Sequence, residues 1–474
     1  MHLVRKGRVA LGASIVGTLR FQADKVSIFR HHSTTTPSPR TTQPKMHTLS
    51  ENKADASAYA FGDDLANYSS LRHNFYLLLH GRRMWLPLVM LGIYNVLAPL
   101  YLTTWITNAL YWSGCILLQR YSVRGRMNRL RKDFTDHVCV VTGGTSGIGL
   151  YTAMQLWEMG AHVVVASRPG KETETREFIR KNCRLPKESE EDTPLERLTF
   201  VSVDLSDQLE VMAAAARIKG MFDNRVDLLV NSAAVWREVP NATRQGLEEH
   251  IATNFLGPFH LTEALLPSLR RSRRGGRIVY VTCASHNGVR RADVVRERMT
   301  LKPSEDTQQL TARCYSASKL GNIYHVQSLA ARRYEGIPLN TPSADLRPVD
   351  VCAVDPGFCA TGHTWRESPP FLGTGLLGRA LRSLWMKDGY EGSQTVVNCC
   401  VREDLESGGF YAACMCMPSG LSRRAHDSKS CREVMQWAMA KAIARYYTVR
   451  PRADNKGDTS SSVSNNLSKV SSAN

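Results

Sequence analysis

The spacing of apolar residues divides the chain into an uncharged stretch and a longer region of alternating pattern. Residues 84–118 carry no charged side chain. Between Asp136 and about Met417, short apolar runs alternate with segments of helical periodicity. This alternation indicates strands of a parallel sheet that are joined by helices covering both faces. We therefore expect one α/β domain over residues 136–417.

The uncharged stretch 84–118 has the composition of a membrane segment. A helical crossing takes about 20 apolar residues, so the stretch is long for one crossing and short for two. Arg82 and Arg83 precede it, and the run Arg120–Lys132 adds six basic residues and no acid. Because basic flanks favour the cytosolic side, a hairpin bent near Pro99 is favoured over a single span. A buried core helix fits this length poorly.

The two ends of the chain are predicted to be extensions of this core. Residues 1–50 hold eight Lys/Arg and one acid, so residues 1–70 are expected to form a basic, mostly disordered extension. The composition also suits a mitochondrial transit peptide, whereas a start at Met46 would leave residues 1–45 out of the mature protein. Residues 418–474 should form a C-terminal helix and a disordered tail rich in Ser and Asn.

Charge and cysteine content narrow the environment of the protein. The net charge is +18 over 474 residues, and the twelve cysteines show no disulfide framework and no zinc-like spacing with histidines. Reduced thiols and no metal site are therefore expected. No nucleic-acid module accompanies the charge, so no nucleic-acid partner is expected. The predicted location is a membrane with the domain facing the cytosol, at the endoplasmic reticulum or a lipid droplet; the mitochondrion is the alternative.

The first strand–helix–strand unit carries the clearest chemical signal. In VCVVTGGTSGIGLYTAMQLWEMGAHVVVASR, an apolar strand is followed by a glycine turn, an amphipathic helix and a second strand. Gly143, Gly147 and Gly149 allow a tight turn and a close approach of the backbone to a pyrophosphate at the positive end of the helix. Glycines in this setting predict a dinucleotide-binding site.

Five more motifs follow the glycine turn in order. They are VDLSD with Asp204, NSAA at Asn231, HIATNFLGPFHLTEALLPSL with Asn254, YSASK, and VDPGFCAT. Together with T-G-x-x-x-G-I-G, they resemble the short-chain dehydrogenase/reductase family, most of all its membrane-anchored retinol dehydrogenase-like branch. The resemblance implies a single doubly wound Rossmann domain with a parallel seven-stranded sheet, preceded by a membrane anchor. The cofactor-binding residues that it implies are Gly143, Thr145, Ser146, Gly147, Ile148, Gly149, Arg168, Asp204, Leu205, Asn231, Tyr315, Lys319, Pro356, Gly357 and Thr361.

The YSASK motif places Tyr315 four residues before Lys319, one helical turn apart. Hydride transfer to or from a carbonyl carbon needs a proton at the oxygen, and a tyrosine with a pKa of about 10 is a poor base at neutral pH. A nearby ammonium favours the phenolate and lowers that pKa. We therefore predict Tyr315 as general acid/base and Lys319 as the group that tunes it. The family also implies that Lys319 holds the nicotinamide ribose and that Asn254 carries a relay water; alternatively, Asn254 only bonds to backbone.

The family places a third catalytic hydroxyl at the end of the fifth strand, as the second serine of a pair. Here RIVYVTCAS puts Thr282 and Cys283 at these positions, and a thiol is a weak donor. Side chains alternate along a strand, so Ser285 would share the face of Cys283, and a bend could bring it into reach. Ser285 is therefore favoured over Cys283. These departures, with Ser232 and Ala234 in NSAA, leave open a cofactor-binding pseudoenzyme that serves as sensor or scaffold.

The residues after the second and sixth strands bear on cofactor and substrate. The second strand ends at Arg168, with Lys171 nearby and no acid before Glu172. NADP is favoured over NAD, because a 2′-phosphate needs positive charge; alternatively, Arg168 only stacks on adenine. An apolar segment after the sixth strand suits a lid over a small lipophilic substrate, such as a retinoid, a steroid or sterol, or a fatty aldehyde, although ordinary lid packing would need the same residues. They are Trp365, Phe371, Leu372, Leu376, Leu377, Leu381 and Trp385. Membrane lipid is a further expected partner, and a homodimer is left open.

Overall fold

The computed structural model describes seven stretches of the chain. They lie in the second of two units, Met1–Asp63 and Asp64–Asn474. The described residues are 86–101, 105–183, 195–237, 241–289, 307–333, 347–360 and 384–449. The predicted N-terminal extension, the Ser/Asn-rich tail and most of the predicted lid lie outside them.

A sheet of eight strands in the order β3-β2-β1-β4-β5-β6-β7-β8 forms the centre of the fold. Neighbouring strands from β3 to β7 are parallel, and β7 and β8 are antiparallel. The strands are β1 (Val138–Thr142), β2 (His162–Ser167), β3 (Leu198–Ser202), β4 (Leu228–Asn231), β5 (Gly276–Val281), β6 (Val349–Asp355), β7 (Phe410–Ala412) and β8 (Met415–Cys416).

The described sheet differs from the predicted seven-stranded parallel sheet at one edge. Ala412 of β7 pairs with Met415 of β8 around the two-residue turn Ala413–Cys414. Both turn residues have positive φ, 51° and 62°, as a tight hairpin that follows the twist of the strands requires. Because neither residue is glycine, asparagine or aspartate, the run FYAACMCM carried no turn signal.

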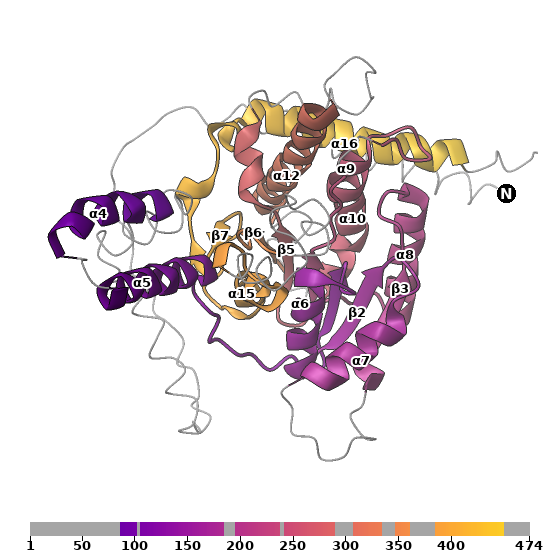
Figure 1. The fold of residues 1–474 in the computed structure, drawn as a ribbon. Coiled ribbons are helices and arrows are strands. Elements are labelled where there is room, and N and C mark those ends of the chain that lie inside the picture. Colours follow the sequence, from indigo (N-terminus) through magenta and orange to yellow (C-terminus); the bar gives the residue numbers. More distant parts are fainter. Residues whose placement is uncertain are drawn as a thin grey trace, which may run out of the picture. The chain divides into compact units, whose positions relative to one another are not determined.

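Helices cover both faces of the sheet, as predicted for a doubly wound domain (Figure 1). One face carries α6 (Gly147–Glu158), α7 (Glu172–Asn182) and α15 (Gly389–Val401). The other carries α8 (Gln208–Met221), α9 (Glu249–Ile251), α10 (Gly257–Arg270), α12 (Thr307–Ala331) and α16 (Ser428–Val449). Val141 packs with the first set and Val140 with the second, because successive side chains of a strand point to opposite faces.

The parallel arrangement brings the predicted site residues to one edge of the sheet. Strands β1, β4, β5 and β6 end at Thr142, Asn231, Val281 and Asp355. The strand order reverses between β1 and β4. Doubly wound sheets bind ligands outside the carboxyl ends of their strands at such a reversal, so the fold places the predicted cofactor motifs where this rule expects a ligand.

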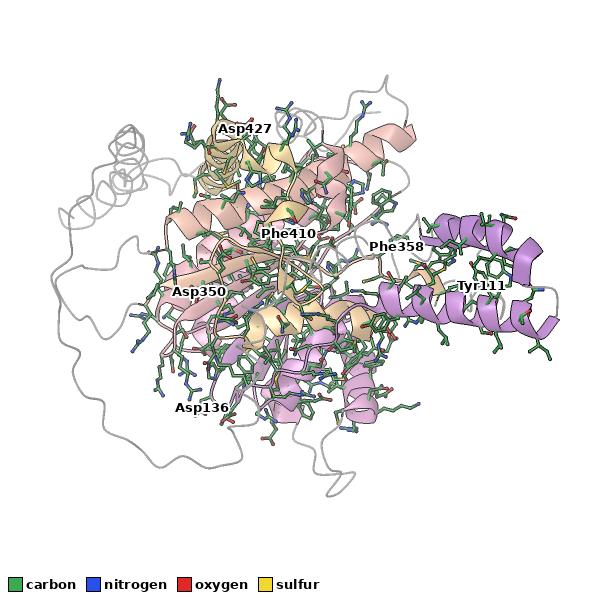
Figure 2. All side chains as sticks on the ribbon, turned by 90° about the vertical axis from the view of Figure 1, so that its left-hand side faces the viewer. Tyr111, Asp136, Asp350, Phe358, Phe410 and Asp427 are labelled. Carbon is green, nitrogen blue, oxygen red and sulfur yellow. The ribbon has the colours of Figure 1, made fainter. Side chains whose placement is uncertain are left out.

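Two helices cover the predicted membrane segment, α4 (Leu86–Tyr101) and α5 (Trp105–Arg124), and α5 continues beyond Leu118. The Tyr94 hydroxyl donates to Asn108 Oδ1 at 3.1 Å, and the Tyr111 hydroxyl donates to the main-chain oxygen of Met90 at 2.6 Å. Figure 2 shows Tyr111 between the two helices, which therefore form a helical hairpin. No helix within the described ranges is both long and apolar enough to cross a membrane.

Polar contacts attach the end of this hairpin to the domain. Arg120 and Arg124 pair with the Glu391 carboxylate in the first turn of α15. The main-chain N–H of Asn128 then donates to Gln394 Oε1 at 3.2 Å. The chain therefore enters the domain along α15 before it reaches β1.

Candidate active site

The glycine turn after β1 has the geometry of a phosphate-binding turn. Gly143 and Gly147 have φ values of 67° and 53°, which glycine adopts more readily than any other residue. A Cβ at Gly149 would lie 2.4 Å from the main-chain oxygen of Gly143, so only glycine fits there. Thr145 and Ser146 complete the turn, and α6 begins at Gly147. The turn fits a pyrophosphate at the N-terminus of α6.

The ends of β2 and β3 hold the predicted adenosine-side residues. Arg168 is exposed, and its guanidinium makes no hydrogen bond or ion pair with any residue that the structure describes. Asp204 accepts the main-chain N–H of Ser206 at 2.8 Å, and Leu205 is buried. Ile148 follows the turn on α6 and packs in the core on that face of the sheet.

The segment after β4 packs against the glycine turn. Asn231 is buried, and its Nδ2 donates to Thr262 Oγ1 at 3.0 Å. The N–H groups of Ser232 and Ala233 donate to Thr142 Oγ1 at 3.0 and 3.1 Å. A Cβ at Gly143 would lie 2.8 Å from Cα of Ala233. The ends of β1 and β4 are thus closely packed against each other beneath the glycine turn.

Tyr315 and Lys319 lie one turn apart on α12, as predicted. The Lys319 ammonium is 5.5 Å from the centre of the Tyr315 ring and donates to the main-chain oxygen of Val281 at 3.2 Å. Trp236 packs edge-on against the same ring at 4.7 Å. Trp236 lies in a loop without a motif, so nothing in the sequence points to it.

Burial has the largest effect on the pKa values of Tyr315 and Lys319. Burial raises the pKa of Tyr315 well above its usual value, and Cys283 raises it further. Burial also lowers the pKa of Lys319. Without a bound cofactor, the hydroxyl of Tyr315 is therefore protonated at neutral pH. The predicted lowering of its pKa by Lys319 stays a prediction for the cofactor-bound enzyme.

Cys283 contacts Tyr315, and Ser285 lies on the turn that follows Cys283. Strand β5 ends at Val281, and a 3₁₀ turn follows from Ala284 to Gly288. The premise that the strand continues to Ser285 is therefore wrong. Cys283 Sγ lies 3.8 Å from the Tyr315 hydroxyl and 2.7 Å from Ser285 Oγ. The thiol therefore contacts both hydroxyls.

Asn254 lies on a π-helical turn, Ala252–Leu256, and is fully buried. Its Oδ1 accepts the N–H of Val235 at 2.7 Å, and its Nδ2 donates to the oxygen of Val235 at 2.9 Å. Both ends of the amide are thus committed to backbone. The main-chain oxygen of Asn254 cannot receive the usual bond from four residues on, because residue 258 is proline.

The loop after β6 contains Pro356 and Gly357. Gly357 has a φ of 85°, and its N–H donates to Asp355 Oδ1 at 2.8 Å. Cys359 then forms a parallel bridge with Lys387, which closes the base of the predicted lid. Thr361 and the predicted lid residues from Trp365 to Leu381 lie outside the described residues, whereas Trp385 is half-buried.

Comparison with known proteins identifies the family. A sequence model of the family described as short chain dehydrogenase matches residues 137–294. Short chain dehydrogenase atnD of Emericella nidulans is 30% identical over 59% of this chain and 84% of its own length. The chain belongs to the short-chain dehydrogenase/reductase family.

Other members are similar over most of their length. Human polyprenol dehydrogenase is 29% identical over 58% of this chain and 76% of that protein. Mouse retinol dehydrogenase 12 is 29% identical over 64% of this chain and 88% of that protein. The predicted family is confirmed, and these relatives agree with the predicted retinol dehydrogenase-like branch. As a short-chain dehydrogenase/reductase, the protein is an oxidoreductase of a family that uses NAD or NADP.

Proposed function

We propose that this short-chain dehydrogenase/reductase is a membrane-associated, NADP-dependent enzyme that interconverts an alcohol and a carbonyl on a lipophilic substrate. The observation that carries the proposal is the buried Tyr315–Lys319 pair beside Cys283, at the same sheet edge as the glycine turn. The substrate class is a retinoid, a steroid or sterol, or a fatty aldehyde. Relatives named polyprenol dehydrogenase and retinol dehydrogenase support a lipophilic substrate.

In the reducing direction, Tyr315 donates a proton to the substrate oxygen. Its raised pKa keeps the hydroxyl protonated at neutral pH, as a general acid requires. The cofactor, when bound, supplies the hydride. The Ser285 hydroxyl and the Cys283 thiol are the two candidates for a second donor to the same oxygen, and the hydroxyl is the stronger of the two.

The other two predicted catalytic residues act on Tyr315. Lys319 holds the nicotinamide ribose, and its ammonium favours the tyrosinate after the proton has left. Because the side chain of Asn254 is committed to Val235, we assign the relay water to the main-chain oxygen of Asn254. The proline at position 258 supports this assignment.

The end of β2 supports NADP over NAD. Arg168 is exposed, and its guanidinium makes no hydrogen bond or ion pair within the described part of the chain. No acid precedes Glu172 after this strand, so there is no carboxylate at the strand end to bind a ribose 2′-hydroxyl. A 2′-phosphate would gain a charge-assisted hydrogen bond from the guanidinium.

The helical hairpin supports membrane association. Large apolar side chains are exposed on both of its helices, far more than the scattered apolar residues of an ordinary surface. They are Val89, Leu91, Ile93, Val96, Leu97, Ile106, Leu110, Trp112, Ile116, Leu117 and Leu118. We infer that the hairpin enters lipid from one side and keeps the domain on the cytosolic face of the endoplasmic reticulum or a lipid droplet. A mitochondrial membrane remains the alternative.

The test is NADPH oxidation by the detergent-solubilised protein against retinal, steroid ketones and long-chain aldehydes, with short-chain aldehydes as the water-soluble comparison. Turnover of lipophilic carbonyls with NADPH and little with NADH is the expected result. A second candidate function, a cofactor sensor or scaffold, is favoured by the weakly donating thiol next to Tyr315. Tight NADPH binding without turnover on any carbonyl would support it and reject the enzyme.

A further inference from the structure

A chain of hydrogen bonds crosses the core on the α10 and α12 face of the sheet. Asn231 Nδ2 lies 3.0 Å from Thr262 Oγ1, which lies 2.8 Å from the Tyr280 hydroxyl. That hydroxyl lies 2.7 Å from His325 Nδ1. All four side chains are at most 3% exposed. Thr262 is on α10, Tyr280 on β5 and His325 on α12, so four elements contribute to one continuous chain.

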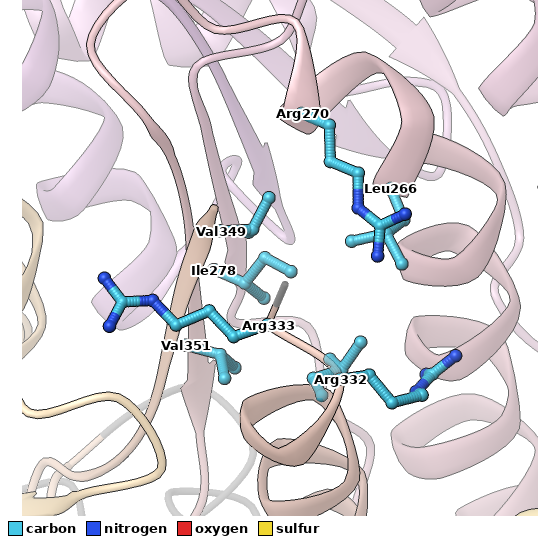
Figure 3. Close-up of a pocket in the computed structure, with 8 residues that line it drawn as sticks. Leu266, Arg270, Ile278, Arg332, Arg333, Val349 and Val351 are labelled. Atoms are coloured by element: carbon cyan, nitrogen blue, oxygen red, sulfur yellow. The ribbon is translucent and has the colours of Figure 1, made fainter. Parts of the chain in front are cut away.

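The chain ends in an ion pair at the opposite edge of the sheet. His325 Nε2 lies 3.0 Å from Glu263 Oε1, and Glu263 pairs with Arg332. Arg332 borders a small hollow between α10, α12 and the first residues of β5 and β6 (Figure 3). Asn231, in contrast, is the last residue of β4 at the cofactor edge. The hydrogen bonds therefore connect the two edges of the sheet.

The ion pair determines which nitrogen of His325 carries the proton. Burial raises the pKa of Glu263, but the His325 hydrogen bond and the Arg332 charge lower it more, to about 2. Burial lowers the pKa of His325, so the imidazole is neutral at pH 7 with a single proton. Facing a carboxylate, that proton lies on Nε2, and Nδ1 is left as an acceptor.

The protonation of His325 then determines the direction of each remaining hydrogen bond. A hydroxyl has one hydrogen, and that of Tyr280 goes to His325 Nδ1 at 2.7 Å rather than to the Pro258 oxygen at 3.2 Å. The Thr262 hydroxyl donates to Tyr280, so Thr262 can only accept from Asn231. One ion pair thus fixes the orientation of the Asn231 amide, four hydrogen bonds away.

The orientation of Asn231 bears on the glycine turn. Asn231 Oδ1 is buried, and no residue in the described ranges donates a hydrogen bond to it. Nδ2 is therefore the end of the amide that holds the side chain in place. The next two residues, Ser232 and Ala233, are bonded to Thr142 and packed on Gly143. A shift of Asn231 would therefore displace Ser232 and Ala233 from the glycine turn.

We propose that Tyr280 and His325 are positioning residues for cofactor binding, and that the relay from Arg332 to Asn231 holds the end of β4 against the glycine turn. The proposal rests on the NADP-dependent function proposed above. Breaking the relay leaves buried polar groups unpaired and releases the Asn231 amide. The loss of one such hydrogen bond should weaken NADPH binding about 5- to 10-fold.

The first test compares two buried tyrosines. Tyr280→Phe breaks the relay, whereas Tyr324→Phe removes an equally buried hydroxyl that donates to the Arg424 oxygen at 2.8 Å. Both variants should lower the thermal midpoint, since each loses a buried hydrogen bond. Only Tyr280→Phe should raise the NADPH dissociation constant, measured by NADPH fluorescence. Equal dissociation constants in the two variants would overturn the proposal.

The second test is a rescue at His325. In His325→Gln, the amide can still donate to Glu263 and accept from Tyr280, whereas His325→Leu can do neither. We expect near wild-type NADPH binding in the glutamine variant and weakened binding in the leucine variant; equal binding rejects the relay. This pair decides the question if Tyr280→Phe fails to fold. A wild-type protein that binds no NADPH would instead reject the proposed function.

Discussion

At the scale of single residues, Tyr315 carries the chemistry. Tyr315→Phe keeps the ring that packs against Trp236 at 4.7 Å and removes only the proton donor. We expect the turnover number to fall about 10²- to 10⁴-fold, while the NADPH dissociation constant stays near the wild-type value. Steady-state kinetics and fluorescence titration measure the two quantities, with Tyr324→Phe as the control. More than about a tenth of wild-type turnover would remove Tyr315 from the role of general acid.

The contact between Cys283 and Ser285 leads to a second prediction at this scale. Because a thiol is a weak donor, Ser285→Ala should lower the turnover number about 10²- to 10³-fold, the effect of losing an oxyanion donor. Cys283→Ala should have a mild effect, and Cys283→Ser should be neutral or activating. The readout is the turnover number of each purified variant with one carbonyl substrate.

The opposite pattern would have a different meaning. If Cys283→Ser raised activity by orders of magnitude and Ser285→Ala did nothing, the position next to Tyr315 would be the donor site. The wild-type chain would then be a weakened enzyme, and the sensor or scaffold function would be favoured. The 3.8 Å distance from Cys283 Sγ to the Tyr315 hydroxyl makes this outcome a real test.

At the scale of elements, local patterns predicted most of what the structure contains. The strand–turn–helix unit at Gly143 and the one-turn spacing of Tyr315 and Lys319 follow from spacing alone, because backbone geometry determines both. The residue at which β5 ends could not be predicted from the spacing. Strand β4 pairs with β5 as far as Tyr280 and β6 as far as Val281, so the strand ends where these pairings end. The end of the strand is set by contacts with neighbouring strands, and nothing in RIVYVTCAS indicates it.

The buried polar contacts were also beyond the sequence. Nothing in HIATNFLGPFHL shows that the Asn254 amide bonds to Val235, since the two residues meet only in the folded chain. The relay through Thr262, Tyr280 and His325 joins three separate elements. Motifs identify residues that bind ligands, whereas the residues that hold them in place carry no pattern of their own.

The hairpin allows a prediction at the element scale. Deleting residues 84–118 should move the protein from the membrane pellet to the supernatant after carbonate washing. Leu110 and Leu117 are 69% and 70% exposed, so replacing both with serine should weaken membrane retention without lowering the thermal midpoint. Leu209→Ser with Met212→Ser, at exposed apolar positions on α8, is the matched control.

Topology separates the hairpin from a single span. If both ends of 84–118 lie on one side, tags at the two termini of the chain should be digested together, or protected together, when intact vesicles are treated with protease. Digestion of one tag alone would reject the hairpin in lipid. Release of the intact wild-type protein by carbonate would reject embedding itself.

At the scale of the whole molecule, buried histidines should make stability depend on pH. Burial lowers the pKa of His162, His286 and His325 below 6.5. The unfolded chain then binds more protons than the folded chain below this value, so these groups stabilise the fold above pH 6.5 and lose that effect as the pH falls. Glu263, with a pKa of about 2 instead of 4.5, adds stability above pH 4.5 that is lost between 4.5 and 2.

The thermal midpoint of unfolding should therefore decrease in two stages on acidification, first below pH 6.5 and then below pH 4.5. His325→Gln removes one titrating group and keeps its hydrogen-bonding pattern, so its midpoint should fall less than that of the wild type between pH 7 and pH 5. His426→Gln, at a histidine on the surface, is the matched control and should follow the wild-type curve. A His325→Gln curve parallel to that of the wild type would show that the buried imidazole takes up a proton as readily as in the unfolded chain, which contradicts a pKa of His325 lowered by burial.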